Sequence, residues 1–324
     1  MSAGRIPVPH LTSDDSPGAA GISLAQGWYP AVPRCEWPTL GLIGACYGVW
    51  GIATVWIADI SLIAGMIVTS IAIALFSSLQ HEALHGHPFR NRLANAALIF
   101  PALTLMIPYL RFRDTHLDHH RDPLLTDPYD DPETNFLDPA VWQKLPRWRR
   151  ALLTFNNTLL GRILIGTGYS QVMFMISDWR AIRAGDARVL RGWLWHVPAL
   201  LPVLLWLGMI GNMPLWAYII AAYIGLSLIK IRTFLEHRAH LDAQGRTVII
   251  EDRGPLAFLF LNNNLHAVHH SHPGTPWYRL PQLYAANRAA FAEKNGGYIY
   301  RSYAQIFRHH LLRAKDPVAH PFFR

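Results

Sequence analysis

One apolar stretch sets the architecture: residues 39–80 read TLGLIGACYGVWGIATVWIADISLIAGMIVTSIAIALFSSLQ. The stretch contains no lysine or arginine, and Asp59 is its only acidic residue. A helix rises about 1.5 Å per residue and crosses the hydrocarbon core of a bilayer in about 20 residues, so this stretch is long enough to cross twice. We therefore expect a transmembrane hairpin whose turn lies near Ala58-Asp59-Ile60-Ser61.

A second stretch of this kind begins at Trp193. No charged residue occurs between Trp193 and Ile229, and Gly211-Asn212-Met213-Pro214 is suited to a turn within it. The whole chain is 51% apolar and only 15% charged, which is the composition of a membrane protein. The prediction is an all-α integral membrane protein with about four transmembrane helices in two hairpins, at 39–80 and 193–236.

The positive charge lies outside these hairpins or at their ends, and both predicted turns lack it. By the positive-inside rule the turns face outward, while both termini and the histidine clusters described below face the cytoplasm. We expect a cytoplasmic tail at 1–38 and one membrane domain at 39–324, with a cytoplasmic helical cap formed by 81–192 and 237–324. The tail has no long apolar run after a basic start, so no cleaved signal peptide is expected.

A third apolar stretch, Leu93–Leu110, is shorter and contains Pro101 and Pro108. If it crossed the membrane as an ordinary third span, the histidine clusters before and after it would lie on opposite sides. Because these clusters are expected to share one metal centre, we predict a re-entrant or interfacial segment that returns to the cytoplasmic face.

Histidines gather in three places outside the hairpins. The first cluster is His81-Glu-Ala-Leu-His85-Gly-His87, and two copies of the pattern H-x-x-H-H follow at 116–120 and 266–270. On a helix, positions i, i+3 and i+4 fall within an arc of about 100°, so each copy is expected to direct three imidazoles at a common centre. Imidazole nitrogens bind iron, zinc and copper, and one four-coordinate ion cannot use so many of them. The clusters therefore predict more than one metal ion.

The first cluster also fits a different chemistry. His81-Glu82-Ala-Leu-His85 satisfies H-E-x-x-H, in which two histidines bind zinc and the glutamate is the general base of a metalloprotease. A membrane zinc peptidase would need one further ligand and would leave both H-x-x-H-H copies without a role. We therefore favour a dinuclear centre, in which Glu82 orients an imidazole by accepting its second N–H.

Further candidates lie near the clusters. The second hairpin ends shortly before His237 and His240, and we expect one of them to bind metal, more readily His237, because it continues the helix toward the clusters. His87 and His272 each follow a cluster and precede a proline, which favours a supporting role. The candidate supporting side chains around the ligands are Glu82, His87, Asp118, Glu236, His240 and His272.

The order of clusters and hairpins resembles the membrane fatty acid desaturase superfamily, whose relatives include alkane monooxygenases and carotenoid ketolases and hydroxylases. The likeness runs from about Ser77 to Pro281 and includes Asp127-Pro-Tyr-Asp-Asp-Pro132 and Pro276-Trp-Tyr-Arg-Leu-Pro281. It implies a centre of two non-haem iron ions on the cytoplasmic side. Where some relatives carry an asparagine one turn before a ninth histidine, this chain has Thr233. The implied ligands are His81, His85, His116, His119, His120, His266, His269 and His270, with His237 as the ninth.

The resemblance also implies a reaction: dioxygen-dependent oxidation of an unactivated C–H bond in a lipid, most directly desaturation of a fatty acyl chain. Hydroxylation or ketolation of a hydrocarbon, carotenoid or lipid headgroup is the alternative, because the ligand set does not separate these outcomes. The zinc intramembrane peptidase is a distant third. The substrate is expected to enter an apolar tunnel with walls from Leu103–Leu110 and Leu226–Ile231.

Other partners follow from composition and from missing motifs. No flavin, nicotinamide or haem fingerprint occurs in the sequence, so we expect an external electron donor: a ferredoxin, a rubredoxin or a b-type cytochrome. The net charge of +8 and the run Arg147-Trp-Arg-Arg150 favour binding to membrane lipid rather than nucleic acid, because tryptophan is interleaved with the arginines. The acidic, proline-containing segment 122–138 predicts a loop. Cys35 and Cys46 are too few for a disulfide framework.

Overall fold

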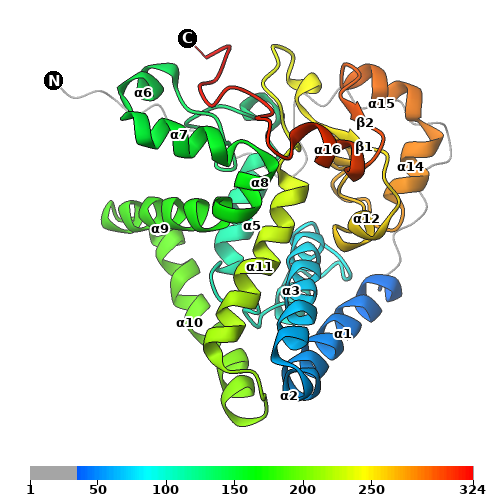
Figure 1. The fold of residues 1–324 in the computed structure, drawn as a ribbon. Coiled ribbons are helices and arrows are strands. Elements are labelled where there is room, and N and C mark those ends of the chain that lie inside the picture. The colour runs from blue at the N-terminus through cyan, green and yellow to red at the C-terminus, as the bar shows by residue number, and fades with distance from the viewer. Residues whose placement is uncertain (1–34, 324) are drawn as a thin grey trace.

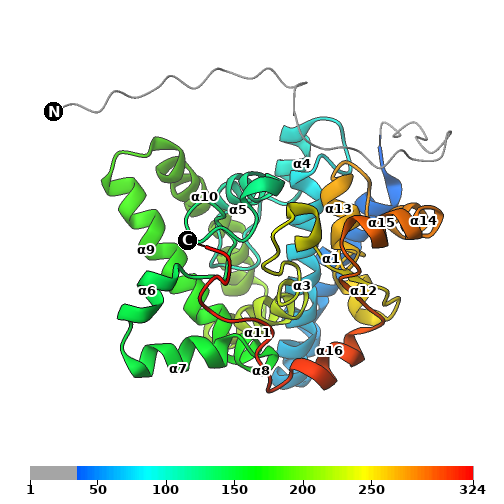
Figure 2. The same cartoon turned by 90° about the horizontal axis from the view of Figure 1, so that it is seen from above.

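The computed structural model describes residues 35–323, so most of the predicted tail at 1–38 lies outside the described residues. Helices make up 65% of the structure, and its two named strands form one small sheet, which confirms a mostly helical protein. Figure 1 shows long helices in the lower part of the molecule and short helices with loops above them, and Figure 2 shows the same arrangement from above.

The first hairpin consists of α1 (Trp37–Ile52), a π-helical turn (Ala53–Ile57), α2 (Ala58–Ile60) and α3 (Leu62–Leu84). Ser61 interrupts the helix with an extended backbone, and its hydroxyl accepts a hydrogen bond from the Ala64 N–H at 3.3 Å, which caps α3. The predicted turn at 58–61 is confirmed. Because α3 continues to Leu84, the returning helix extends into the first histidine cluster.

The second hairpin consists of α10 (Ala187–Met209) and α11 (Leu215–Thr233). The helix begins at residue 187 rather than 193, because the Asp186 carboxylate accepts from the N–H groups of Arg188 and Val189 and caps it. The predicted turn at 211–214 is confirmed. The turn also contacts the first hairpin, since the Asn212 N–H donates to the carbonyl of Thr54 at 2.9 Å. Both hairpin turns therefore lie at the same end of the molecule (Figure 1).

The shorter apolar stretch forms no spanning helix in the described structure. It is divided between α4 (Arg92–Leu98), a non-helical segment at 99–108, and α5 (Tyr109–His119). The backbone of this region is paired by the long helices: the hydroxyls of Tyr47 and Tyr218 donate to the carbonyls of Leu98 and Leu103, both at 2.8 Å. Irregular backbone at this depth is tolerated only where protein satisfies it. The structure agrees with a segment that turns back rather than crosses.

One long helix was not predicted. Residues 81–192 were expected in the cap, but they include α8 (Leu159–Gly161), a π-helical turn (Arg162–Gly166) and α9 (Thr167–Arg183), which form one continuous helix. By length and composition this helix could cross a membrane, so five helices of the described chain meet that criterion instead of four. Figure 1 shows α9 running across the direction of α10 and α11. The helix escaped prediction because Arg162, Asp178 and Arg180 interrupt its apolar pattern.

The remaining elements form the upper part of the molecule, which we call the cap. The loop at 122–138 is confirmed apart from a 3₁₀ turn at Asp122–Leu124, and a second 3₁₀ turn lies at Ala243–Arg246. The helices of the cap are α6 (Pro139–Lys144), α7 (Arg147–Asn156), α12 (Pro255–Leu259), α13 (His266–Ser271), α14 (Leu280–Ala286), α15 (Arg288–Lys294) and α16 (Tyr303–His310). β1 (Ile249–Ile250) pairs in parallel with β2 (Ile299–Tyr300), with Ile249 opposite Ile299.

The contact between α3 and α11 lies at the centre of the long helices (Figure 1). Gly225 of α11 faces α3 so closely that an added Cβ would lie 2.7 Å from the backbone oxygen of Ser70. Small residues allow the backbones of membrane helices to approach in this way. The pair α3 and α11 is therefore closely packed. α3 extends into the first histidine cluster, and α11 ends four residues before His237.

Candidate metal centre

The two helices of this central pair deliver the first histidine cluster and His237. His81 lies in the last turn of α3, and His85 follows its last residue. α11 ends at Thr233, so His237 lies beyond the helix, where it forms an isolated β-bridge with Thr247. The prediction that His237 continues the helix is wrong, because the chain leaves the helix four residues earlier. The residue still reaches the other clusters.

Both H-x-x-H-H copies are helical, at the end of α5 and in α13. Neither copy directs its three imidazoles at one centre, so that prediction is wrong. Adjacent positions on a helix differ by about 100°, and therefore His119 and His120 point to different places, as do His269 and His270. Each copy instead divides its histidines between two neighbouring groups.

The five-histidine group comprises His81, His85, His116, His120 and His269. The four-histidine group comprises His119, His237, His266 and His270. Within each group, one ring nitrogen of every member lies within 4.8 Å of those of the others. The two groups adjoin, because the rings of His120 and His270 stack with their centroids 4.2 Å apart. The structure thus brings all nine implied ligands together.

The nitrogen atoms are spaced like ligands of a shared ion. Facing Nε2 atoms are 3.0 Å apart between His116 and His120 and 2.8 Å apart between His119 and His237. Two nitrogen ligands at about 2.1 Å from one ion and at a right angle would be about 3 Å apart. In the described structure, the Nε2 atoms of His81 and His85 are buried without a hydrogen-bond partner. The donor set therefore fits bound metal.

Burial keeps most of these imidazoles in the neutral form that binds metal. It lowers the pKa of several members well below the ordinary value, and neighbouring histidines lower it further, in His85, His120, His237, His266 and His269. His119 differs, because burial opposes its charge but Glu133 and Asp131 together raise its pKa to about 9. A bound cation would take the place of that proton.

The loop at 122–138 supplies carboxylates to the second histidine cluster. Asp131 Oδ1 lies 2.7 Å from Nδ1 of His119, and Glu133 Oε1 lies 3.0 Å from Nδ1 of His116. Burial would raise the pKa of Glu133, but His116 and His119 hold it far below its ordinary value. Histidines that bind metal usually donate their second N–H to a carboxylate, which fixes the ring. The sequence predicted no individual role for these carboxylates, although six acidic residues follow the cluster closely.

A second pair of supporting groups holds His266. Asn263 Oδ1 lies 3.2 Å from Nδ1 of His266, and Glu236 Oε1 lies 3.7 Å from the same nitrogen. Glu236 is also paired with Arg232 at 2.8 Å. Glu236 was a predicted supporting residue and lies at the site, whereas Asn263 carried no sequence signal beyond its place before the third cluster.

In the described structure, the side chains of the remaining predicted supporting residues form no hydrogen bond or ion pair with the histidine groups. Glu82 is buried, and its carboxylate accepts from the backbone N–H of Trp277 at 3.1 Å. In the described structure this carboxylate therefore orients no imidazole of the site by a hydrogen bond. Asp118 is on the exposed face of α5, where it pairs with Arg121 at 3.0 Å.

Three predicted histidines have local roles instead. His87 is buried and pairs through Nδ1 with Glu36 at 2.7 Å, a contact that ties the start of α1 to the chain after α3. His240 bonds the backbone of Asp242, so His237 rather than His240 reaches the site. His272 packs against Phe291, and burial lowers its pKa.

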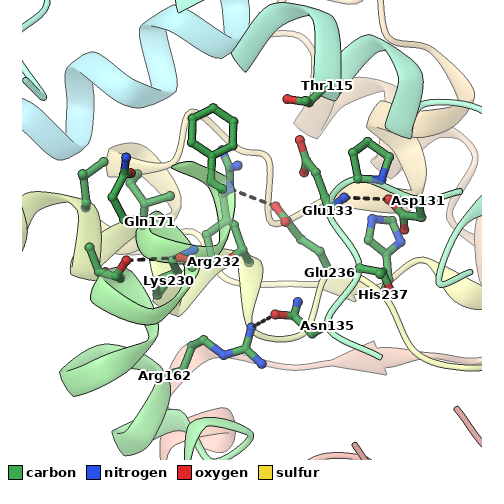
Figure 3. Close-up of a pocket in the computed structure, with 18 of the residues that line it drawn as sticks. Thr115, Asp131, Glu133, Asn135, Arg162, Gln171, Lys230, Arg232, Glu236 and His237 are labelled. Carbon is green, nitrogen blue, oxygen red and sulfur yellow. Dashed lines mark hydrogen bonds and ion pairs between the residues drawn. The ribbon is translucent and has the colours of Figure 1, made fainter. Parts of the chain in front are cut away.

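A cavity of about 290 Å³ reaches the four-histidine group beside His237. Figure 3 shows Glu133, Glu236 and His237 on one side of it and Lys230 and Arg162 on the other. The expected walls of an apolar tunnel contribute only in part, from Thr104, Ile107, Leu226, Ile229 and Lys230. The cavity is therefore more polar than predicted, because the loop at 122–138, Arg162 of the π-helical turn before α9, and the cations of α11 line it.

Fold and site together define a membrane-type helical protein with two adjoining histidine groups that could hold metal ions. The sequence matches the family model of fatty acid desaturases over residues 50–302, which include all nine histidines. The chain therefore belongs to the fatty acid desaturase family. Among curated proteins, no sequence matches this chain.

Proposed function

We propose that this chain is a di-iron oxidoreductase that uses dioxygen to oxidise an unactivated C–H bond of a lipid, with acyl desaturation as the leading reaction. The observation that carries the proposal is the convergence of nine imidazoles into two adjoining groups in a member of the fatty acid desaturase family. One iron ion bound by each group would use all nine histidines as ligands. An iron pair held by neutral imidazoles supplies the oxidising power to break such a bond, which no side chain has.

The residues of the chain hold the imidazoles and shield them. Asp131 and Glu133 accept the Nδ1–H of His119 and His116, so that each Nε2 faces the centre. His116 and His119 are each only 2% exposed, which keeps bulk water from the oxidising site. Both effects are expected of a centre that handles reactive oxygen chemistry.

The cavity beside His237 is the proposed substrate site. Its walls would fix the distance between the C–H bond and the two groups, and this placement decides between removal of a second hydrogen and addition of oxygen. Hydroxylation or ketolation of a hydrocarbon, carotenoid or lipid headgroup is the second candidate. The polar lining of the cavity favours oxidation of a lipid headgroup among these alternatives, since Lys230, Asn135 and Glu133 line the cavity.

The proposed orientation places the hairpin turns outside and the cap in the cytoplasm, on the argument from positive charge. Electrons would come from a separate donor, namely a ferredoxin, a rubredoxin or a b-type cytochrome. Exposed arginines of the cap, including Arg121 and Arg288, would complement the acidic surface of such a carrier.

The test compares cells that express the chain with cells that express His119→Ala, and His309→Ala serves as the control because His309 is exposed and outside both groups. Lipids are analysed by mass spectrometry. Loss of a hydrogen pair identifies desaturation, gain of an oxygen atom identifies hydroxylation, and His119→Ala should abolish either product. Metal analysis of the purified chain should give about two iron ions. One zinc ion with peptide cleavage, or identical lipids with and without the chain, would contradict the proposal.

A further inference from the structure

The cavity beside the four-histidine group contains more cations than free carboxylates. Arg162, Lys230, Arg232 and Lys315 line it, together with the acidic residues Asp131, Glu133 and Glu236. The three carboxylates are already engaged. Asp131 lies 2.7 Å from His119, Glu133 lies 3.0 Å from His116, and Glu236 lies 2.8 Å from Arg232.

Two of the four cations have acidic partners. Arg232 pairs with Glu236, and Lys315 lies 3.7 Å from Asp316 while its ammonium group donates to the backbone carbonyl of His237. These two cations thus belong to the structure around the histidines. Arg162 and Lys230 are the two cations of this cavity for which the described structure shows no acidic partner.

Arg162 has only neutral partners in the described structure. Its guanidinium group donates to the side-chain oxygen of Asn135 (Figure 3). It also donates to the backbone carbonyl of Asn156 and to the side-chain oxygen of Asn157. Only 3% of its surface is exposed. A buried cation without a counter-ion loses hydration that neutral amides restore only in part. Arg162 is therefore a site of positive potential at the cavity wall.

Lys230 makes no hydrogen bond or ion pair with any residue that the structure describes. Lys230 lies in a helix that could span a membrane, where unpaired charges are rare and mark binding sites or pathways. Lys230 is in the last turn of α11, where the helix dipole favours a cation. The helix dipole does not explain Arg162, because Arg162 is near the N-terminal end of its helix, where the dipole disfavours a cation.

The same two cations also line a second cavity of about 680 Å³, between α5, α7, α9 and the loop at 122–138. They therefore lie where the two cavities adjoin. From this junction the first cavity leads to His237, and the second leads away past Met173 and Tyr169 of α9. A ligand anchored at the junction would present its nearest carbons to the histidine groups.

We infer that Lys230 and Arg162 bind an anionic oxygen group of the substrate, a carboxylate or a phosphate, at the junction of the two cavities. Guanidinium and ammonium groups form strong charge-assisted hydrogen bonds with such oxygens. The substrate is then a lipid with an anionic end, oxidised near that end rather than far along its chain. This assignment of substrate class rests on the proposed function, but the binding site itself does not depend on turnover.

The test measures binding to the purified full chain in an uncharged detergent, with three radiolabelled probes of similar chain: palmitate, lysophosphatidate and hexadecanol. The wild-type chain should bind one anionic probe at least about tenfold more tightly than hexadecanol, and Lys230→Met should remove that preference. Lys230→Arg keeps the charge and should restore the preference. Lys144→Met removes an exposed lysine of α6 and should leave all three affinities unchanged.

Preference for palmitate would identify a carboxylate ligand, and preference for lysophosphatidate a phosphate ligand. Equal binding of all three probes to the wild-type chain would overturn the inference whether or not the variants fold, as would a Lys230→Met chain that keeps the wild-type preference. Lipid oxidation is assayed separately in cells that express the same variants, because the proposed reaction draws electrons from a separate donor. Anion preference without oxidised product would retain the site and reject the proposed function, and product without anion preference would do the opposite.

Discussion

Glu133 contacts the five-histidine group through His116. Its carboxylate lies 3.0 Å from Nδ1 of His116 and 3.9 Å from Nε2 of His119. Glu133→Gln keeps the size of the side chain but removes the charge that orients His116. Loss of such a supporting carboxylate lowers metal affinity by about 10-fold to 100-fold. We expect this loss in a competition between the reconstituted chain and a chelator.

Asp118→Asn provides the matched control, because Asp118 is a carboxylate of α5 that pairs with Arg121 at the surface. Its metal affinity should equal that of the unmodified chain. If Glu133→Gln retained the original affinity, or if both variants lost metal equally, the orienting role of the loop carboxylates would be wrong.

At the level of residues, the sequence identified all nine histidines but not their division. Cluster spacing and the resemblance to desaturases were sufficient to name them, because both depend only on the order of residues in the sequence. Which histidines share a group depends on the helical phase of α5 and α13 and on how the two helices meet. The supporting role of Asp131 and Glu133 was not predicted for a related reason. A loop has no regular periodicity, so the direction of its side chains cannot be inferred from the sequence.

Among the helices, the contact between α3 and α11 offers a direct test of packing. An alanine at position 225 would place its Cβ 2.7 Å from the Ser70 oxygen and 2.9 Å from Ile73, so one helix must move. Such overpacking costs about 1–3 kcal/mol. Thermal denaturation in detergent should therefore show that Gly225→Ala is less stable than the unmodified chain.

Gly44→Ala is the control, since no atom lies within 4 Å of an added Cβ at that position of α1. Alanine favours helix over glycine by up to about 1 kcal/mol, so this variant should be as stable as the unmodified chain or more stable. Equal destabilisation by both substitutions would mean that helix packing at Gly225 is not the cause.

The direction of α9 carries a second prediction about helices. Its crosswise course relative to α10 and α11 in Figure 1 leads us to expect that α9 lies at the membrane surface instead of spanning it. Val172 of α9 and Ile71 of α3 are both exposed and both near the middle of their helices. Cysteine at each position can carry a fluorophore whose quenching by brominated lipids reports depth. Val172→Cys should be shallow and Ile71→Cys deep, whereas equal depth would make α9 a fifth span.

The sequence predicted the hairpins better than α9 for a physical reason. Runs of about 40 apolar residues with at most one charge are easy to recognise, because their length is sufficient for two crossings. In the α9 helix, Asp178 is buried and paired with Arg111 of α5 at 2.9 Å, so a charge that argued against an apolar helix is satisfied by a distant part of the chain. Such pairing across elements is not visible in the local sequence.

For the whole molecule, the contact of Asn212 with Thr54 couples the orientation of the two hairpins. Because both turns lie at one end and the cap at the other, a single pair of labelling sites determines the topology (Figure 1). In a chain with Cys35→Ser, where Cys46 remains buried, Asp59→Cys should react with an impermeant maleimide on intact cells. Lys144→Cys of α6, in the cap, should react only after the membrane is permeabilised.

This outcome would place the histidine groups on the cytoplasmic side, within reach of a soluble electron donor. In the reverse pattern, Lys144→Cys would be labelled on intact cells and Asp59→Cys would be protected. This result would place the cap outside the cell and would exclude a cytoplasmic electron donor. Labelling of both sites on intact cells would contradict this arrangement, because it would place the hairpin turns and the cap on the same side of the membrane. The charge distribution argues for the first result, since both turns lack lysine and arginine.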